Sequence, residues 1–284
     1  MTDFLNCGDH DRLILGDCLV EMPRMEAESV DMIFADPPYH LSNGGFTCHA
    51  GKAVSVHKGN WDKSNGVDKD FDFTLEWLSL CKRLLKPNGT IWISGTYHSI
   101  FRCGFALQQL GYHILNDISW FKPNASPNLS CRYFTASHET LIWASKSKSS
   151  KHTFNYTEMK NGRFIKDFIK KPGKQMRSVW AIGTPTVEEK KYGKHPTQKP
   201  VELLDRIIRA CTKKGGVVFD PFMGSGTTGV TCMKVGREFI GIEKEKKYYT
   251  LAGKRIFNEV RRNALNFAEE EFWNEQKPSE SLGV

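Results

Sequence analysis

Several features are missing from this 284-residue sequence, and each absence narrows the class of protein it can belong to. No apolar run approaches the roughly 18–20 residues that a membrane-spanning helix needs. The first residues, MTDFLNCGDHDR, lack the basic and then apolar pattern of a secretory signal, so we expect a cytoplasmic protein. No repeat of fixed period and no low-complexity tract occurs, which leaves an ordinary globular fold.

Paired cysteines are missing as well. The eight cysteines are scattered along the chain and form no CxxC pair. Zinc sites and disulfide frameworks both depend on characteristic cysteine spacings, and neither is indicated. We therefore expect reduced, mostly packed thiols and no bound metal.

Positive charge is present but concentrated in one segment. The net charge is +8, and residues 145–199 hold 14 Lys and Arg against 4 Asp and Glu, which leaves the rest of the chain near −2. Charge runs are commonly just solvated surface. This one also carries aromatic side chains, and cations can contact phosphates while aromatics stack on bases. We therefore expect a nucleic acid partner. The aromatic residues are Phe154, Tyr156, Phe164, Phe168 and Trp180.

Predicted strands and helices alternate along most of the chain. Apolar runs predict strands at 12–15, 30–35, 90–95, 139–146, 217–220 and 238–243, and helical spacing predicts helices between them, including 200–216 and 244–272. Residues 40–70 lack periodicity and are expected to form a long loop. The alternation predicts an α/β fold with a doubly wound, mostly parallel sheet.

A glycine-rich turn, GSGTTG at 224–229, follows the predicted strand that ends at Asp220. The next strand ends at Glu243, whose carboxylate could bind ribose hydroxyls, while the helix N-terminus offers free N–H groups. If the glycines served only a tight turn, the position of Glu243 at the end of the next strand would have no explanation. The pattern therefore indicates a nucleotide-like cofactor, and both NAD and S-adenosylmethionine (AdoMet) are compatible with it.

The stretch FADPPYHLSNGG ends a predicted buried strand with Asp36, Pro37, Pro38 and Tyr39. Proline lacks an N–H donor, so the groups left to face a cleft are acceptors, and acceptors suit a substrate amino group. An amine held by its hydrogens would have its lone pair free to attack the AdoMet methyl group, with Tyr39 as a flat face beside it. In the competing structural interpretation Asp36 caps a turn and Tyr39 is core.

Three motifs in one order make the pattern specific. DPPY (36–39), GKHPTQKP (193–200) and DPFMGSGTTG (220–229) resemble those of the DNA amino-methyltransferases, which methylate adenine at N6 or cytosine at N4. With the catalytic motif first, the order resembles the permuted beta class, over roughly residues 10–260. The resemblance implies a Rossmann-like AdoMet-dependent methyltransferase fold. It implies a catalytic half at 1–144, an inserted basic target-recognition segment at 145–192, an AdoMet-binding half at 193–272 and a tail at 273–284.

The resemblance also implies roles for individual residues. Asp36 and the Pro37 carbonyl would hold the target amine, and Tyr39 would stack on the base. Glu243 would bind the ribose of AdoMet, and Lys199 is suggested to pair with its carboxylate. The expected cofactor-binding residues are Asp17, Cys18, Thr197, Gln198, Lys199, Asp220, Phe222, Gly224, Ser225, Gly226, Thr227 and Glu243. The expected DNA contacts are Asn124, Asn128, Arg132, Lys170, Lys171, Lys174 and Arg177.

Aspartate at the start of the catalytic motif is more usual among the adenine enzymes of this family, so methylation of adenine N6 is the leading expectation and cytosine N4 the alternative. The stretches LSNGG and NLSCRYF resemble the second adenine methyltransferase of GATC-specific restriction–modification systems, which suggests GATC as the target. The enzyme would flip the base out of duplex DNA, and single-stranded DNA is a conceivable second substrate. A homodimer and a cognate restriction endonuclease are conceivable partners.

Two interpretations from other classes are less complete. An NAD-dependent oxidoreductase would explain the glycine turn but not the DPPY motif or the basic segment. A catalytically inactive DNA-binding protein would not need the intact Asp36 and Glu243.

Overall fold

The computed structural model describes residues 12–39, 62–125, 127–161 and 173–265 in full. For residues 5–6, 46–49, 52–55 and 266–275 it gives the backbone alone. The helices in this part of the chain include none that is long and apolar enough to cross a membrane.

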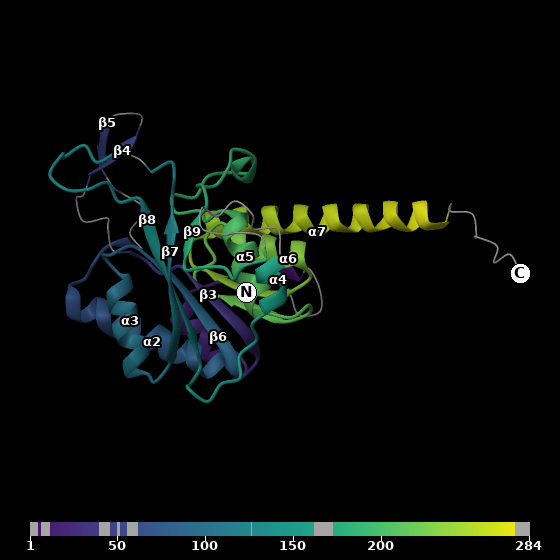
Figure 1. Cartoon of the computed structure of the whole chain (residues 1–284), viewed down its shortest axis with the longest axis horizontal. Coiled ribbons are helices and arrows are strands. Elements are labelled where there is room, and N and C mark those ends of the chain that lie inside the picture. The colour runs from purple at the N-terminus through teal and green to yellow at the C-terminus, as the bar shows by residue number, and fades with distance from the viewer. Residues whose placement is uncertain are drawn as a thin grey trace, which may run out of the picture.

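A nine-stranded sheet lies at the centre of the described structure (Figure 1). Its order is β1 (Leu5–Asn6), β2 (Arg12–Leu15), β11 (Glu238–Glu243), β10 (Val217–Asp220), β3 (Val30–Ala35), β6 (Leu85–Gly95), β8 (His138–Ser145), β7 (His113–Phe121) and β9 (Val179–Ala181). The strands from β2 to β6 are all parallel, whereas β8 runs antiparallel to both of its neighbours. The expected mostly parallel sheet is confirmed.

Helices cover both faces of the sheet, as a doubly wound fold requires (Figure 1). One face carries α1 (Cys18–Glu21), η1 (Met22–Arg24), α2 (Val67–Leu84) and α3 (Ile100–Gln109). The other carries α4 (Tyr156–Asn161), α5 (Val201–Cys211), α6 (Thr227–Val235) and α7 (Lys246–Glu275). The short helix η3 (Glu188–Lys190) precedes α5. The two hydrophobic cores therefore lie on opposite sides of one sheet.

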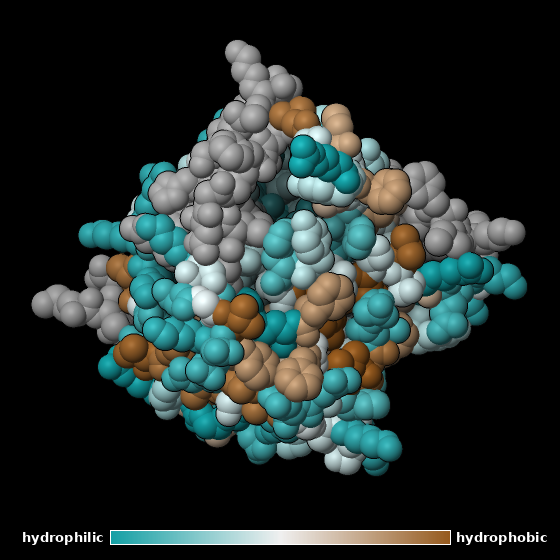
Figure 2. Space-filling view, turned by 90° about the vertical axis from the view of Figure 1, so that its left-hand side faces the viewer, coloured by the Kyte–Doolittle hydropathy of each residue, from teal (hydrophilic) through white to brown (hydrophobic). Residues whose placement is uncertain are grey.

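The apolar patterns of the sequence account for this packing. The central strand β3 reads VDMIFA, and five of its six residues are buried because helices cover both of its faces. In α5, Leu203, Leu204, Ile207 and Ile208 share one face and have no exposed surface. On α3, Phe101 and Phe105 are exposed. The surface seen from the left-hand side of Figure 1 mixes hydrophilic and hydrophobic residues (Figure 2).

The structure corrects the expected loop at 40–70. Part of it is an antiparallel pair, β4 (Phe46–His49) with β5 (Lys52–Ser55), and α2 already begins at Val67. Asp68 and Asp70 lie in the first turn of α2, where carboxylates are favourable, and Asp70 accepts a hydrogen bond from the Asn65 N–H (3.1 Å). The basic segment also supplies β9, which pairs in parallel with β7, so this part of it belongs to the main sheet.

Candidate active site

Two adjacent strands end at the candidate active site. β3 and β10 pair in parallel, with Val218 opposite Met32, so Asp36 and Asp220 follow neighbouring carboxyl ends. From here the chain continues to β6 on one side and to β11 on the other, which makes this edge a topological switch point. A cavity of about 410 Å³ opens there, a size typical of small-ligand sites. Both aspartates line it.

Eleven of the twelve residues expected to bind the cofactor line this cavity. They are Asp17, Cys18, Thr197, Gln198, Lys199, Asp220, Phe222, Gly224, Ser225, Thr227 and Glu243. They come from the start of α1, the end of β10 and the turn into α6, the end of β11 and the loop before α5, so the fold brings together residues more than 200 positions apart. The cavity is also lined by residues that the sequence did not single out. These are Lys63, Asn65, Lys69, Asp70 and Phe73 near the start of α2, and His195 and Tyr248.

Gly226 is the one expected cofactor residue that does not line the cavity. Its φ is +75°, and a Cβ there would lie 2.8 Å from the Cβ of Ala252 in α7. Arg255 of the same helix donates to the Ser225 carbonyl (2.5 Å). Gly226 therefore serves the close packing of the turn against α7, whereas Gly224 (φ +54°) lies in the cavity wall beside His195.

Two carboxylates shape the glycine turn. Glu243 accepts the Gly224 N–H (2.8 Å) and the Glu245 N–H (2.7 Å), which holds its side chain at the strand tip. Asp220 accepts the Phe222 N–H (3.0 Å) and the Thr228 hydroxyl (2.5 Å). Burial raises the pKa of each carboxyl to about 7. Each would be partly protonated at neutral pH with no ligand present.

Asp17 also lines the cavity, close to the end of β11, where the neighbouring Gly16 N–H donates to the Glu243 carbonyl (3.0 Å). Asp17 accepts the Leu19 N–H (3.0 Å) as the N-cap of α1 and pairs with Lys244 (2.8 Å). Burial alone would raise its pKa, but the hydrogen bonds from Lys244 and Leu19 lower it below the usual value. Asp17 is therefore an ionised acceptor at neutral pH, as a contact to an adenine amine requires.

The donors and acceptors of the cavity fit AdoMet. The Oε1 atom of Gln198 is buried and has no hydrogen-bond partner among the described residues, while its amide donates to the Glu189 carbonyl (3.0 Å). A buried acceptor without a partner costs free energy, so it favours a ligand with an N–H group. AdoMet offers such groups in its methionine part and in its adenine amine, which also suits Asp17, and it offers ribose hydroxyls for Glu243. The residues present therefore suit a charged nucleoside better than a pyrophosphate, for which these carboxylates would be repulsive.

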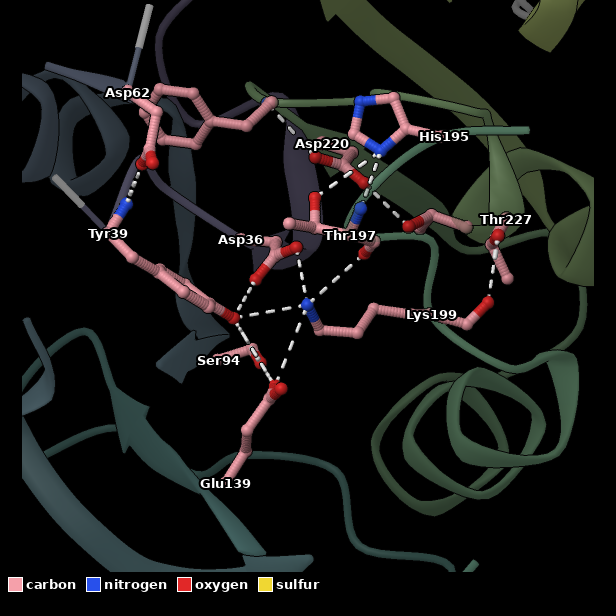
Figure 3. A network of polar contacts seen from close by, with 12 residues as sticks. Asp36, Tyr39, Asp62, Ser94, Glu139, His195, Thr197, Lys199, Asp220 and Thr227 are labelled. Carbon is pink, nitrogen blue, oxygen red and sulfur yellow. Dashed lines mark hydrogen bonds and ion pairs between the residues drawn. The ribbon is translucent and has the colours of Figure 1, made fainter. Parts of the chain in front are cut away.

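The catalytic motif forms a compact polar network (Figure 3). The Tyr39 hydroxyl donates to Asp36 Oδ1 (2.5 Å), and the Lys199 ammonium donates to Asp36 Oδ2 (2.6 Å). The Tyr39 backbone N–H is held by Asp62 (2.9 Å), on the segment that leads into α2. Burial raises the pKa of Asp36, and the Lys199 ammonium opposes that rise. Of the motif, Asp36 and Pro38 line the cavity, whereas Pro37 and Tyr39 are not part of its lining.

The positions of Lys199 and Tyr39 differ from the expectation. Lys199 was expected to meet the carboxylate of AdoMet, but its ammonium is only 6% exposed and is bonded to Asp36, to Tyr39 (3.1 Å) and to Glu139 (3.6 Å). Tyr39 was expected to present a flat face, but it is 4% exposed and turns its hydroxyl inward. Buried charges need partners, and the nearest carboxylates supply them for Lys199.

Glu139 is the member of this site that sequence reasoning missed. It is the second residue of β8, is buried, and pairs with Lys122 as well as with Lys199. Its Oε2 atom also accepts a hydrogen bond from Ser94 (3.3 Å) and lies 3.3 Å from the Tyr39 hydroxyl oxygen. Burial would raise its pKa, but the two ammonium groups lower it to about 2. Its one signal in the sequence is a lone acid beside a strand-forming run, which also fits an exposed strand end.

The residues expected to contact DNA differ in their hydrogen bonds and in their exposure. Asn128 shapes its own loop: its amide donates to the Tyr133 carbonyl (2.7 Å), and its oxygen accepts the Ser130 N–H (2.9 Å). Asn124 is exposed and donates to Thr184 (3.1 Å). Arg132, Lys174 and Arg177 are exposed, and Lys170 and Lys171 lie outside the described residues. The β7–β8 loop also exposes two aromatic side chains, Tyr133 (67%) and Phe134 (98%).

An α/β sheet with an acidic strand tip, a glycine turn and a second acid at the next strand fits the class of AdoMet-dependent methyltransferases. Residues 30–254 match the family model described as DNA methylase, and the chain belongs to this family. It is 51% identical to the Type II methyltransferase M2.DpnII of Streptococcus pneumoniae over 86% of this chain and 88% of that protein. It is 46% identical to M2.MboI of Moraxella bovis, over 86% of each chain.

Solved structures agree with this assignment. The crystal structure of the M1.HpyAVI–SAM complex superimposes with a TM-score of 0.61 at 30% identity, over 86% of this chain and 98% of that one. The cytosine-N4-specific PvuII DNA methyltransferase superimposes with a TM-score of 0.66 at 19% identity, over 89% and 92%, and shows the shared fold. The expected fold, DNA methyltransferase activity and cofactor AdoMet are confirmed.

Proposed function

We propose that this enzyme methylates the N6 amine of adenine at a specific DNA sequence, as the modification component of a restriction–modification system. The observation that carries the proposal is the buried Asp36 carboxylate beside the cofactor cavity, on a motif that begins with aspartate. The Type II methyltransferases M2.DpnII and M2.MboI, about half identical over most of the chain, support the restriction–modification setting.

The site residues divide the work between base and cofactor. AdoMet supplies an electrophilic methyl group when it is bound. Asp36 and the Pro37 carbonyl accept hydrogen bonds from the amine and keep its lone pair directed away from the base ring. Because the nitrogen gains positive charge as it is methylated, a carboxylate at this position stabilises the transition state more than the ground state. Glu243 and Asp17 bind the ribose and adenine of the cofactor, and Gln198 meets an N–H group.

The DNA would lie across the carboxyl edge of the sheet. The β7–β8 loop begins at Lys122 and leads into β8, whose second residue is Glu139. Both residues belong to the Asp36 network, so the exposed Arg132, Tyr133 and Phe134 of this loop belong to the rim of the site. Lys174 and Arg177 extend the positive charge, and cations of this kind contact phosphates. GATC is our proposed target, from the resemblance of LSNGG and NLSCRYF to GATC-specific enzymes. A cytoplasmic location, a homodimer and a cognate endonuclease complete the proposal.

Nucleoside analysis tests the proposal directly. The purified protein is incubated with AdoMet and unmethylated duplex or single-stranded DNA, and the digested nucleosides are separated by mass spectrometry. We expect N6-methyladenine, after which sequencing of the methylated DNA locates the target. N4-methylcytosine would replace the proposed base and retain the mechanism. The absence of any methylated nucleoside on both substrates would overturn the proposal.

The Asp36→Ala variant tests the residue that carries it. We expect loss of methyl transfer by at least about a hundredfold, since removal of one preorganised electrostatic partner costs about 10²–10³ in rate. AdoMet affinity, measured by calorimetry, should stay within a few-fold. If affinity and activity fell together, Asp36 would be a cofactor or folding residue.

A further inference from the structure

In the structure the acceptor for the base amine is already occupied. Both oxygens of Asp36 carry a short hydrogen bond, one from the Tyr39 hydroxyl (2.5 Å) and one from the Lys199 ammonium (2.6 Å). The methylated nitrogen gains a positive charge, and an ammonium that shares its carboxylate would repel it in this buried, low-dielectric site. The reaction therefore requires Lys199 to leave Asp36 when the amine arrives.

A second acceptor lies within reach of both donors. Glu139 Oε2 is 3.6 Å from the Lys199 ammonium and 3.3 Å from the Tyr39 hydroxyl (Figure 3). Charge-assisted hydrogen bonds are about 2.8 Å long, so a shift of about 1 Å would complete the bond from Lys199 to Glu139. Lys122 holds the other oxygen of Glu139, and Ser94 donates to Oε2 (3.3 Å), which fixes this carboxylate in place.

We propose that Glu139 is a positioning residue that receives the Lys199 ammonium and the Tyr39 hydroxyl when the base amine binds Asp36. While no base is present, the Lys199 ammonium and the Tyr39 hydroxyl occupy the two oxygens of Asp36. When the amine binds, it displaces both donors, and they move to Glu139. Because Glu139 receives the displaced donors, a base with an exocyclic amine can take their place on Asp36, whereas a base without this amine cannot. The inference rests on DNA methyl transfer and holds for adenine and cytosine alike.

The charges around the network allow this exchange. Two carboxylates, Asp36 and Glu139, face two ammonium groups, Lys199 and Lys122, so the set is neutral before and after the shift. Burial alone would lower the pKa of Lys199, but the two carboxylates raise it above its usual value, so the ammonium stays charged. A role for Glu139 in folding alone would not require one oxygen atom to lie near both donors of Asp36.

The test compares Glu139→Gln, which keeps the shape and removes the charge, with Glu188→Gln, which removes an exposed acid paired with Lys191. Each variant is titrated with two duplexes: one with the target base found by sequencing, and one with the analogue of that base that lacks the exocyclic amine. In wild type and Glu188→Gln the amine should strengthen binding. In Glu139→Gln this preference should fall by at least fivefold, and the single-turnover methylation rate by at least tenfold. AdoMet affinity should remain close to wild type, and all measurements are made well below the melting temperature of each variant.

A double-variant cycle makes the test independent of a general loss of stability. Because Glu139 acts through Lys199, Glu139→Gln should slow methylation less than threefold in a Lys199→Met background, against at least tenfold in the wild type. An unchanged preference for the amine in Glu139→Gln, or an equal rate loss in both backgrounds, would overturn the exchange. If wild type methylates neither base, the proposed function fails. The preference for the amine is then measured with a GATC duplex and with the same duplex in which purine replaces adenine, and this comparison still tests the exchange.

Discussion

Single residues of the site differ in how far the sequence could predict them. Asp36 and Glu243 each end a predicted strand within a recognisable motif, and the structure places both at the cavity. Glu139 and Lys122 could not be predicted, because they reach Asp36 only through the pairing of β8 with β6 and β7. No spacing in a single sequence encodes that pairing. Lys199 was found by its motif, but its ion pair with Glu139 depends on the same pairing and could not be predicted.

Glu243 provides a pH-dependent prediction at the residue scale. Burial raises its pKa to about 7, and the neighbouring carboxyl of Asp220 has a similar value. Protonated Glu243 accepts fewer hydrogen bonds from ribose hydroxyls than the ionised carboxylate does. Cofactor binding therefore requires the ionised carboxylate, which dominates above pH 7. The groups facing Glu243 also include Glu245 and Tyr248. Burial raises the pKa of Tyr248 above its usual value, and the charges of Glu243 and Glu245 raise it further.

We therefore expect AdoMet affinity to increase several-fold between pH 6 and pH 8 and to level off above. Calorimetric titrations across this range measure it. Glu243→Gln should bind AdoMet at least tenfold more weakly at pH 8 and show a flatter pH profile, with the remaining slope due to Asp220. Equal affinity of wild type and variant at pH 8 would remove Glu243 from the ribose site.

At the scale of elements, apolar runs were sufficient to locate the parallel strands, because strands buried on both faces have few polar residues. They were not sufficient for β4, β5 and β9, which are only four, four and three residues long. The antiparallel direction of β8 was also beyond the sequence pattern, since a buried strand has the same composition in either direction. The elements that position Glu139 were therefore the least predictable ones.

The contact between the glycine turn and α7 yields a prediction at this scale. Gly226 and Gly215 both have positive φ, +75° and +72°, but a Cβ would meet Ala252 at Gly226 and nothing within 4 Å at Gly215. Gly215→Ala should therefore cost only the backbone strain of about 1–2 kcal/mol. Gly226→Ala should destabilise the protein by about 1–3 kcal/mol more, as overpacking does.

Thermal or denaturant unfolding of the two variants measures the difference. Since Ser225 and Thr227 flank Gly226 and line the cavity, the Gly226→Ala variant should also bind AdoMet more weakly, whereas Gly215→Ala should bind it normally. If the two variants had equal stability, the close approach of the turn to α7 would contribute nothing.

At the scale of the whole molecule, the distribution of charge along the sequence is sufficient to indicate a nucleic acid partner. The excess of positive charge falls in one segment, and the described part of this segment exposes Lys174 and Arg177. The sequence could not say which bases are recognised, because recognition depends on a few side chains whose positions follow no periodic pattern.

Charge reversal distinguishes a DNA surface from a general effect of net charge. Lys174→Glu with Arg177→Glu should weaken DNA binding and reduce the slope of log affinity against log salt by about 1 for each phosphate that is no longer neutralised. The matched control is Lys213→Glu with Lys214→Glu, which changes the net charge equally but lies before β10, at the edge of the sheet opposite the cavity. Fluorescence anisotropy titrations from low to physiological salt measure both. A slope that falls equally in both variants would show that overall charge, and not this segment, attracts the DNA.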